Sequence, residues 1–226
     1  MAMQSDYMVT EEASVGYQKR TLIDHVNLHV KKGEILTLIG PNGVGKSTIL
    51  KSIIRQLSLI AGTVSIDEKE LSSYAPKELA KKMAIVMTER IHPERYTCYD
   101  VVATGRYPYT GKMGMLQKED EEKIEEAMRQ VQVEALRDQD FDRISDGQCQ
   151  RVMLARAICQ EPEILVLDEP TSYLDIRYKT DFLWLLRSLA RKRQMAVVMS
   201  LHEIDLAQKI SDQVVCVKEH RVDRVG

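Results

Sequence analysis

The stretch EILTLIGPNGVGKSTILKSII, residues 34–54, decides the fold. An apolar run ends at Gly40, a glycine-rich loop follows, and a helical pattern begins at Lys46. Glycines let successive backbone N–H groups converge on phosphate oxygens, and the N-terminus of a helix adds partial positive charge. Lys46 has the reach for terminal phosphates, and Ser47 has a hydroxyl suited to Mg²⁺. The plainer interpretation is a glycine-rich turn without a ligand, but the flanking strand and helix favour a phosphate-binding site.

Two further apolar runs end in polar residues that suit catalysis. ILVLDEP, residues 164–170, ends in Asp168 and Glu169. These acids fit two tasks of phosphoryl transfer, holding Mg²⁺ and acting on an attacking water. AVVMSLHE, residues 196–203, reaches His202 at its end. Each pattern alone is explained as well by an acidic loop or a structural histidine. Because parallel sheets bind ligands at the carboxyl ends of their strands, the three strand ends together favour one shared site.

Apolar runs without alternation recur along the chain between helical patterns. Such runs indicate a parallel sheet covered on both faces, so we predict an α/β fold with a mostly parallel sheet. SVGY and LIDHVNLHV, within the first 30 residues, predict antiparallel strands at its flank. Helical segments near 99–104 and 118–130 predict an inserted helical lobe. We therefore expect one domain over 1–226, with a core of 1–87 and 146–226 and a helical subdomain of 88–145.

Composition narrows the classes of function. The chain has 226 residues, and its 32 basic and 34 acidic residues give no electrostatic footprint for nucleic acid, so we expect no nucleic-acid partner. The four cysteines lack metal-ligand spacing and no leader precedes them, which predicts reduced thiols in the cytoplasm. No apolar run approaches the roughly 20 residues that cross a bilayer. Work at a membrane would require a partner that supplies the span.

Together these motifs resemble the ATPase subunits of ATP-binding cassette (ABC) transporters over nearly the whole chain. The resemblance implies a P-loop NTPase core that hydrolyses ATP with Mg²⁺ as cofactor. GPNGVGKST is similar to the Walker A loop, ILVLDE to the Walker B strand and SYLD, with Asp175, to the D-loop. The catalytic residues implied are Lys46, Glu169 and the switch histidine His202, and Tyr17 is expected to stack on adenine. The expected nucleotide contacts are Tyr17, Gly40, Pro41, Asn42, Gly43, Gly45, Lys46, Ser47, Thr48, Thr88, Ser145, Gly147 and Gln148, and the expected metal ligands are Ser47, Asp168 and Thr88.

The segment ISDGQ, residues 144–148, resembles the signature sequence of the family. By that resemblance, Ser145, Gly147 and Gln148 face the γ-phosphate of ATP bound to a second subunit, so the protein is expected to close as a homodimer on ATP binding. The plainer interpretation is an ordinary helix start capped by Ser145 or Asp146. Asp146 stands where the common signature has glycine. Since a carboxylate beside a phosphate is costly, we expect Asp146 to cap its own helix.

A second departure lies at the Q-loop, where the family usually has glutamine. MAIVMTER, residues 83–90, offers Thr88 there and Glu89 after it. The Thr88 hydroxyl suits a water or Mg²⁺ but its side chain is short, whereas Glu89 has the reach and adds charge. Both alternatives stay open.

Two other stretches, VVATGRYPYTG (101–111) and TSYLDIRYK (171–179), resemble the ATPases of bacterial importers for ferric siderophores, haem and cobalamin. The implied partners are integral membrane permease subunits and, indirectly, a substrate-binding protein. The implied location is the cytoplasmic face of a bacterial or archaeal membrane, peripherally attached. Tyr107 and Tyr109 either pack a small lobe or dock a permease helix. Because such ATPases usually continue past the strand near Val217, the end at Gly226 suggests a short or truncated C-terminus.

Several other classes of protein share some of these motifs. An ATP-gated dimerising regulator with little hydrolysis is motivated by Thr88, but Glu169 and His202 argue against it. An ABC ATPase of a different transporter class is a further alternative. A chromosome-maintenance head would carry a long coiled coil before Ser145, and a translation factor would carry two cassettes. A GTPase is disfavoured because the sequence has no NKxD motif.

Overall fold

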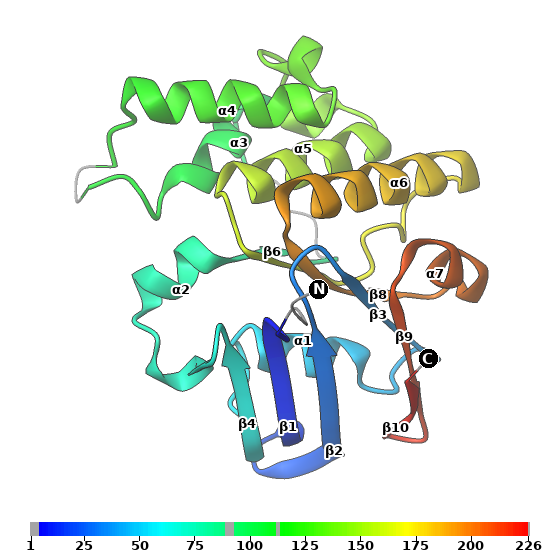
Figure 1. Cartoon of the computed structure of the whole chain (residues 1–226). Helices are drawn as coiled ribbons and strands as arrows, with labels where there is room; N and C mark the ends of the chain where they lie inside the picture. Colours follow the sequence, from blue (N-terminus) through cyan, green and yellow to red (C-terminus); the bar gives the residue numbers. More distant parts are fainter. Residues whose placement is uncertain (1–4, 89–92, 112–113, 226) are drawn as a thin grey trace.

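The strands form two sheets with different roles. The computed structural model describes residues 5–88, 93–111 and 114–225. One sheet has six strands in the order β10-β9-β3-β8-β7-β6, all parallel except β10. The other has four antiparallel strands in the order β2-β1-β4-β5. The predicted α/β fold, with a mostly parallel sheet and antiparallel strands at its flank, is confirmed (Figure 1).

The parallel sheet explains why its strands read as unbroken apolar runs. Its members are β6 (Met83–Val86), β3 (Ile35–Ile39), β7 (Ile164–Leu167), β8 (Ala196–Leu201) and β9 (Gln213–Lys218), with β10 (Arg221–Val225) at the edge. Every residue of β3, β7 and β8 is buried. Along β3, Ile35 and Ile39 face the helical layer, whereas Leu36 and Leu38 face the antiparallel sheet and α1 (Lys46–Ile53). Burial on both faces thus removes the alternation of a half-exposed strand.

The antiparallel sheet is built from tight hairpins. β1 (Met8–Tyr17) turns into β2 (Arg20–Val30) through Gln18 and Lys19, which both have positive φ, as type I′ turns require. β4 (Ala61–Ile66) leads to the short β5 (Lys69–Glu70) in the same way. This sheet places Tyr17, at the end of β1, beside α1.

An ion-pair network joins the two sheets at the end opposite the phosphate loop. Glu163, just before β7, accepts from Lys32 Nζ at 2.5 Å and from Lys82 Nζ at 2.8 Å, and Lys82 also contacts Asp67 at 2.9 Å. Burial raises the pKa of Glu163, but the two lysine hydrogen bonds outweigh burial and lower it to about 2. The carboxylate is therefore charged at neutral pH and ties β6 and β7 to the antiparallel sheet.

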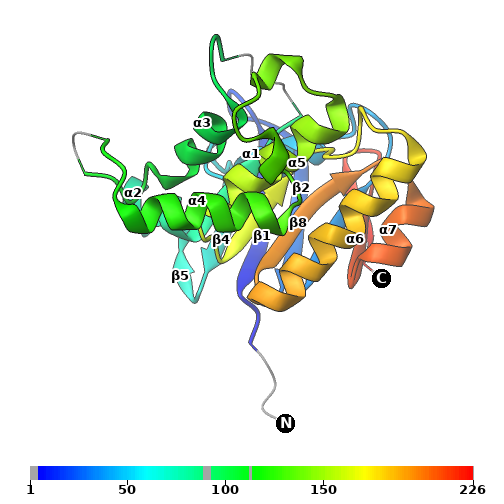
Figure 2. The same cartoon turned by 90° about the horizontal axis from the view of Figure 1, so that it is seen from above.

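Helices cover the other face of the parallel sheet (Figure 2). α6 (Ile176–Arg193) and α7 (Ile204–Ile210) pack near β3 and β8, and α2 (Pro76–Lys82) leads into β6. The predicted helical lobe contains α3 (Cys98–Ala103) and α4 (Lys118–Gln130), the latter with the predicted bounds. Short 3₁₀ turns at 71–73, 104–106, 134–136 and 141–143 complete the element order. Within the described residues, no helix is both long and apolar enough to cross a membrane.

Helix α5 (Asp146–Cys159) connects the lobe to the core. The sequence predicts it as part of the core, and the structure packs it against α3 and α4 as well as β6. Gly105 makes the close approach possible, because a Cβ there would lie 2.3 Å from the carbonyl oxygen of Arg156. Helix α5 is therefore packed against both the helical lobe and the parallel sheet.

Candidate functional site

The glycine-rich loop between β3 and α1 adopts a conformation that side chains would block. Gly45 has φ +112, and a Cβ there would lie 2.5 Å from Ile23 Cδ1. Gly43 has φ +76 and opens to free space. Positive φ at both positions and the close contact at Gly45 favour glycine here, and glycine-rich loops of this kind bind phosphates through their backbone N–H groups.

Lys46 is held inside this loop. Its side chain is almost fully buried, and Nζ donates to the carbonyls of Gly40 (2.8 Å) and Pro41 (3.1 Å). Burial lowers the pKa of Lys46, while the nearby charges of Glu169 and Asp168 oppose that shift. A buried cation in a loop of backbone N–H groups fits an anionic ligand such as the phosphates of ATP.

Asp168 lies at the carboxyl end of β7, next to the phosphate loop. Its Oδ1 accepts from Ser47 Oγ at 3.1 Å and from Ser200 Oγ at 2.7 Å, while Thr88 Oγ1 donates to its main-chain carbonyl at 2.8 Å. A buried carboxylate beside the Ser47 hydroxyl gives the hard oxygen ligands that Mg²⁺ prefers. The residues present therefore fit that metal. The Thr88 hydroxyl donates its proton to the Asp168 carbonyl, and its oxygen keeps lone pairs that could bind a metal. Glu89, the alternative Q-loop residue, lies outside the described residues.

Glu169 and His202 form a pair at the same edge. His202 Nε2 lies 2.7 Å from Glu169 Oε1, and Ser172 Oγ donates to Oε2 at 3.1 Å. Glu169 has φ +48, a left-handed conformation that costs a residue with a Cβ roughly 1 kcal/mol. The structure thus brings together the three strand ends that the sequence singled out, and both carboxylate oxygens of Glu169 are oriented.

Tyr17 lies at the rim of the loop. Its ring is half exposed, and its hydroxyl is 3.4 Å from Thr48 Oγ1. A cavity of about 750 Å³ opens beside it, lined by residues 16–19 and 56–60. The exposed aromatic face next to the phosphate loop is available for stacking a planar base.

The signature segment is a capped helix start. Ser145 is the N-cap: its Oγ accepts from Gln148 N at 3.4 Å, and Gln148 Oε1 accepts from Ser145 N at 2.9 Å. Our expectation that Asp146 caps the helix is wrong, because Asp146 is the first helical residue, and Ser145 has both the extended backbone and the partner three residues on. Among the described residues, the side-chain hydrogen bonds of Ser145 and Gln148 stay within the helix start, and none joins these two residues to residues 40–48. Gly147 instead faces the ring of Tyr178, which would lie 3.6 Å from an added Cβ.

Comparison with known proteins gives the family. The sequence profile described as ABC transporter matches residues 23–172, two thirds of the chain. This chain is an ATPase subunit of the ABC transporter family. It is 46% identical over 217 residues to an uncharacterized ABC transporter ATP-binding protein of Methanocaldococcus jannaschii, covering 96% of this chain and 75% of that one. It is 38% identical to a probable siderophore transport system ATP-binding protein of Bacillus subtilis, covering 96% and 79%. The solved dimeric structure of a bacterial ABC transporter cassette aligns over 97% of both chains, with a TM-score of 0.82 and 26% identity.

The tyrosines of GRYPYTG have different surroundings in this ABC subunit. Tyr109 is packed: Arg106 lies 3.9 Å from its ring centroid, and its hydroxyl donates to the Gln160 carbonyl at 2.9 Å. Tyr107 is 58% exposed. The packing interpretation therefore holds for Tyr109, while Tyr107 is free to meet another molecule.

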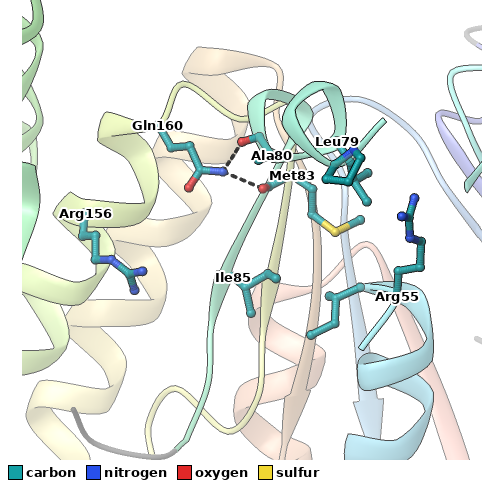
Figure 3. Close-up of a pocket in the computed structure, with 9 residues that line it drawn as sticks. Arg55, Leu79, Ala80, Met83, Ile85, Arg156 and Gln160 are labelled. Atoms are coloured by element: carbon teal, nitrogen blue, oxygen red, sulfur yellow. Dashed lines mark hydrogen bonds between the residues drawn. The ribbon is translucent and has the colours of Figure 1, made fainter. Parts of the chain in front are cut away.

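A surface cavity of about 320 Å³ opens between α2, β6 and α5 (Figure 3). Arg55 and Arg156 stand on opposite sides of it, and Gln160 Nε2 donates to the carbonyls of Ala80 and Met83 (2.7 Å for Met83) at its upper edge. None of its lining residues belongs to the phosphate loop or the acidic strand end; they are Ile54, Arg55, Pro76, Leu79, Ala80, Met83, Ile85, Arg156 and Gln160.

Sequence reasoning missed three polar residues of this ABC subunit. Ser200 binds both acidic residues, Arg106 anchors the helical lobe, and Gln160 joins α5 to β6. Ser200 lies two positions before His202 in an otherwise apolar strand. A single hydroxyl in such a run was the one feature of the sequence that could have indicated a buried hydrogen-bonding role. Arg106 lies within a stretch whose tyrosines drew attention instead.

Proposed function

We propose that this chain drives a membrane importer for ferric siderophores or a related metal chelate, such as haem or a cobalamin-type compound, by hydrolysing ATP. The observation that carries the proposal is the meeting of Lys46, Asp168 and the Glu169–His202 pair at one edge of the sheet. The likeness to a probable siderophore transport protein supports the substrate class.

Each residue has a task that its surroundings suit. Tyr17 stacks on adenine, the loop from Gly40 to Thr48 binds the phosphates, and Lys46 stabilises negative charge that develops on the terminal phosphate. Glu169 accepts a proton from, or orients, the attacking water. His202 holds the Glu169 carboxylate and reaches the γ-phosphate.

Mg²⁺ completes the proposed site. Ser47 and Asp168 would hold it, with the Thr88 oxygen as a further ligand, and when bound it neutralises charge on the phosphates. The chain's own contribution is to keep these oxygens together through the hydrogen bonds of Asp168.

We further propose a homodimer that closes on ATP. The start of α5 offers the backbone N–H of Gly147 and the positive end of the helix to an anion. Ser145 and Gln148, which hydrogen-bond each other in the cap, would exchange those bonds for a phosphate. A second copy brings its phosphate loop to this point. The solved dimeric cassette that this chain resembles supports such an assembly.

Integral permease subunits are the proposed membrane partners, with a substrate-binding protein acting indirectly. They would hold the chain, as a single ATPase domain, at the cytoplasmic face of the membrane. The cavity between α2, β6 and α5 is a suitable docking place for a permease segment, and Tyr107 extends the surface. β6 runs from this cavity to Thr88, whose hydroxyl donates to Asp168, so docking and hydrolysis share one strand.

The test compares three proteins reconstituted with the cognate permease: the unmodified chain, Glu169→Gln, and Glu12→Gln as control. Glu12 is an exposed residue of β1 that contacts His25 and Asn27 of the antiparallel sheet and lines neither the site nor the docking cavity. We expect at least a 100-fold loss of ATPase activity in Glu169→Gln only. We also expect that variant to dimerise with Mg²⁺·ATP in light scattering. An unmodified chain that binds ATP without turnover, even with its permease, would favour the ATP-gated regulator instead. Uptake of radiolabelled ferric siderophore into proteoliposomes then tests the substrate class.

A further inference from the structure

Ser200 touches both acidic residues of the site. It lies on β8, is fully buried, and its Oγ donates to Asp168 Oδ1 at 2.7 Å while accepting from the Glu169 N–H at 2.9 Å. We propose that Ser200 is a positioning residue that sets the orientation of both Asp168 and Glu169. This rests on the proposed function, in which Asp168 holds Mg²⁺ and Glu169 acts on water.

The hydroxyl sits on a rigid support. Ser200 pairs with Leu38 of β3 on one side, and its neighbour Met199 pairs with Leu167 of β7 on the other. A hydroxyl has one proton, so donation to Asp168 directs a lone pair toward the Glu169 N–H. One atom on a central strand therefore fixes the carboxylate of one acid and the backbone of the next.

Thr88 holds the same peptide group from the other side. The Asp168 carbonyl, which accepts from Thr88 Oγ1 at 2.8 Å, and the Glu169 N–H, which donates to Ser200, belong to one planar peptide unit. With both of its polar atoms hydrogen-bonded, this unit cannot rotate freely. That restraint maintains the φ of +48 at Glu169, which an unrestrained residue would leave.

Loss of the Ser200 hydroxyl therefore acts on both acids. Asp168 Oδ1 keeps only the longer bond from Ser47, and the peptide before Glu169 is released on its N–H side. Mutation of a residue that orients a metal ligand typically lowers metal affinity or activity by about 10–100-fold. We expect Ser200→Ala to lower kcat about 10–100-fold and to raise KM for Mg²⁺·ATP by about tenfold at most.

A metal-dependent binding measurement separates this effect from general damage. AMP-PNP affinity is measured by calorimetry with EDTA and again with Mg²⁺. In Ser200→Ala the affinity in EDTA should match that of the unmodified chain, and the gain from Mg²⁺ should fall about tenfold. Ser200→Thr, which retains a hydroxyl, should keep most of the kcat and of the Mg²⁺ gain. Circular dichroism verifies that each variant is folded.

Ser211→Ala is the matched control, because it also removes a hydroxyl hydrogen bond to the central sheet. Ser211 Oγ lies 2.6 Å from Thr37 Oγ1, and neither residue contacts the acids. The inference is overturned if Ser200→Ala and Ser211→Ala have the same kcat and the same Mg²⁺ gain. Failure of the proposed function looks different, since the unmodified chain itself would then lack ATPase activity.

Discussion

Replacement of Arg106 by leucine should be among the most destabilising single changes in the helical lobe. The Arg106 side chain is 4% exposed; Nε donates to Asp120 Oδ1 at 2.9 Å, and one terminal nitrogen donates to the Cys159 carbonyl (2.8 Å) and to Glu161 (2.9 Å). These bonds join the 3₁₀ turn at 104–106 to α4 and to the end of α5.

The magnitude follows from what the substitution leaves behind. Asp120, whose side chain is 10% exposed, becomes a buried carboxylate without its cation, whereas Glu161 keeps Lys123 at 2.7 Å. Removal of one partner of a buried ion pair lowers the free energy of unfolding by about 3–5 kcal/mol. For a chain of this size, that lowers Tm by roughly 6–20 °C. Arg106→Leu combined with Asp120→Asn should recover part of the loss, because it removes the stranded charge.

Urea unfolding followed by circular dichroism measures the effect. The control is Arg143→Leu, because the Arg143 side chain is 85% exposed and pairs with Asp140 at the surface. We expect this control to change the free energy of unfolding by no more than about 1 kcal/mol. If Arg106→Leu lowers the free energy of unfolding no more than Arg143→Leu does, the hydrogen bonds of Arg106 do not stabilise the lobe. The stretch GRYPYTG would then be better explained as a docking surface alone.

Three further outcomes are expected. Glu163→Gln should cost about 1 kcal/mol at neutral pH after solvent screening. Because the folded pKa of Glu163 is about 2 against an ordinary 4.5, its contribution is present above pH 4.5 and is lost as pH falls toward 2, so urea midpoints of the two proteins should converge there. Gly45→Ala should weaken ATP binding at least about tenfold in calorimetry through its positive φ and close contact, whereas Gly111→Ala, with open space around it, should not. Lys46→Met should lower ATP affinity about tenfold or more while Lys51→Met, on the same helix, should bind normally; equal affinities would contradict the role of Lys46.

Local order along the chain made much of the fold predictable. The phosphate loop requires only a strand, a glycine-rich turn and a helix in succession, so residues 34–54 were sufficient for it. The parallel sheet was predictable because burial on both faces leaves unbroken apolar runs. The same logic succeeded for α4, whose charged pattern gave its bounds, and for the antiparallel strands near the N-terminus.

Packing between distant segments was harder to predict. α5 was assigned to the core because its apolar residues suit any interior, and only the fold placed it against α3 and α4. Asp146 was expected to cap that helix from its charge alone, yet the cap depends on backbone conformation, which Ser145 has and Asp146 lacks. No local pattern marked Arg106 as buried, because its partners Asp120 and Glu161 lie 14 and 55 positions away in the sequence.

The sequence by itself determined the residue types at each strand end, and with them the family and the phosphate chemistry. Only the tertiary structure decided how the acids are held: Thr88 and Asp168 are 80 positions apart, and Asp168 and Ser200 are 32 apart. Hydrogen bonds act over about 3 Å, whereas sequence patterns report local periodicity. The two hydrogen bonds that hold the peptide between Asp168 and Glu169, one with Thr88 and one with Ser200, therefore depend on the fold, which brings the ends of β6, β7 and β8 together.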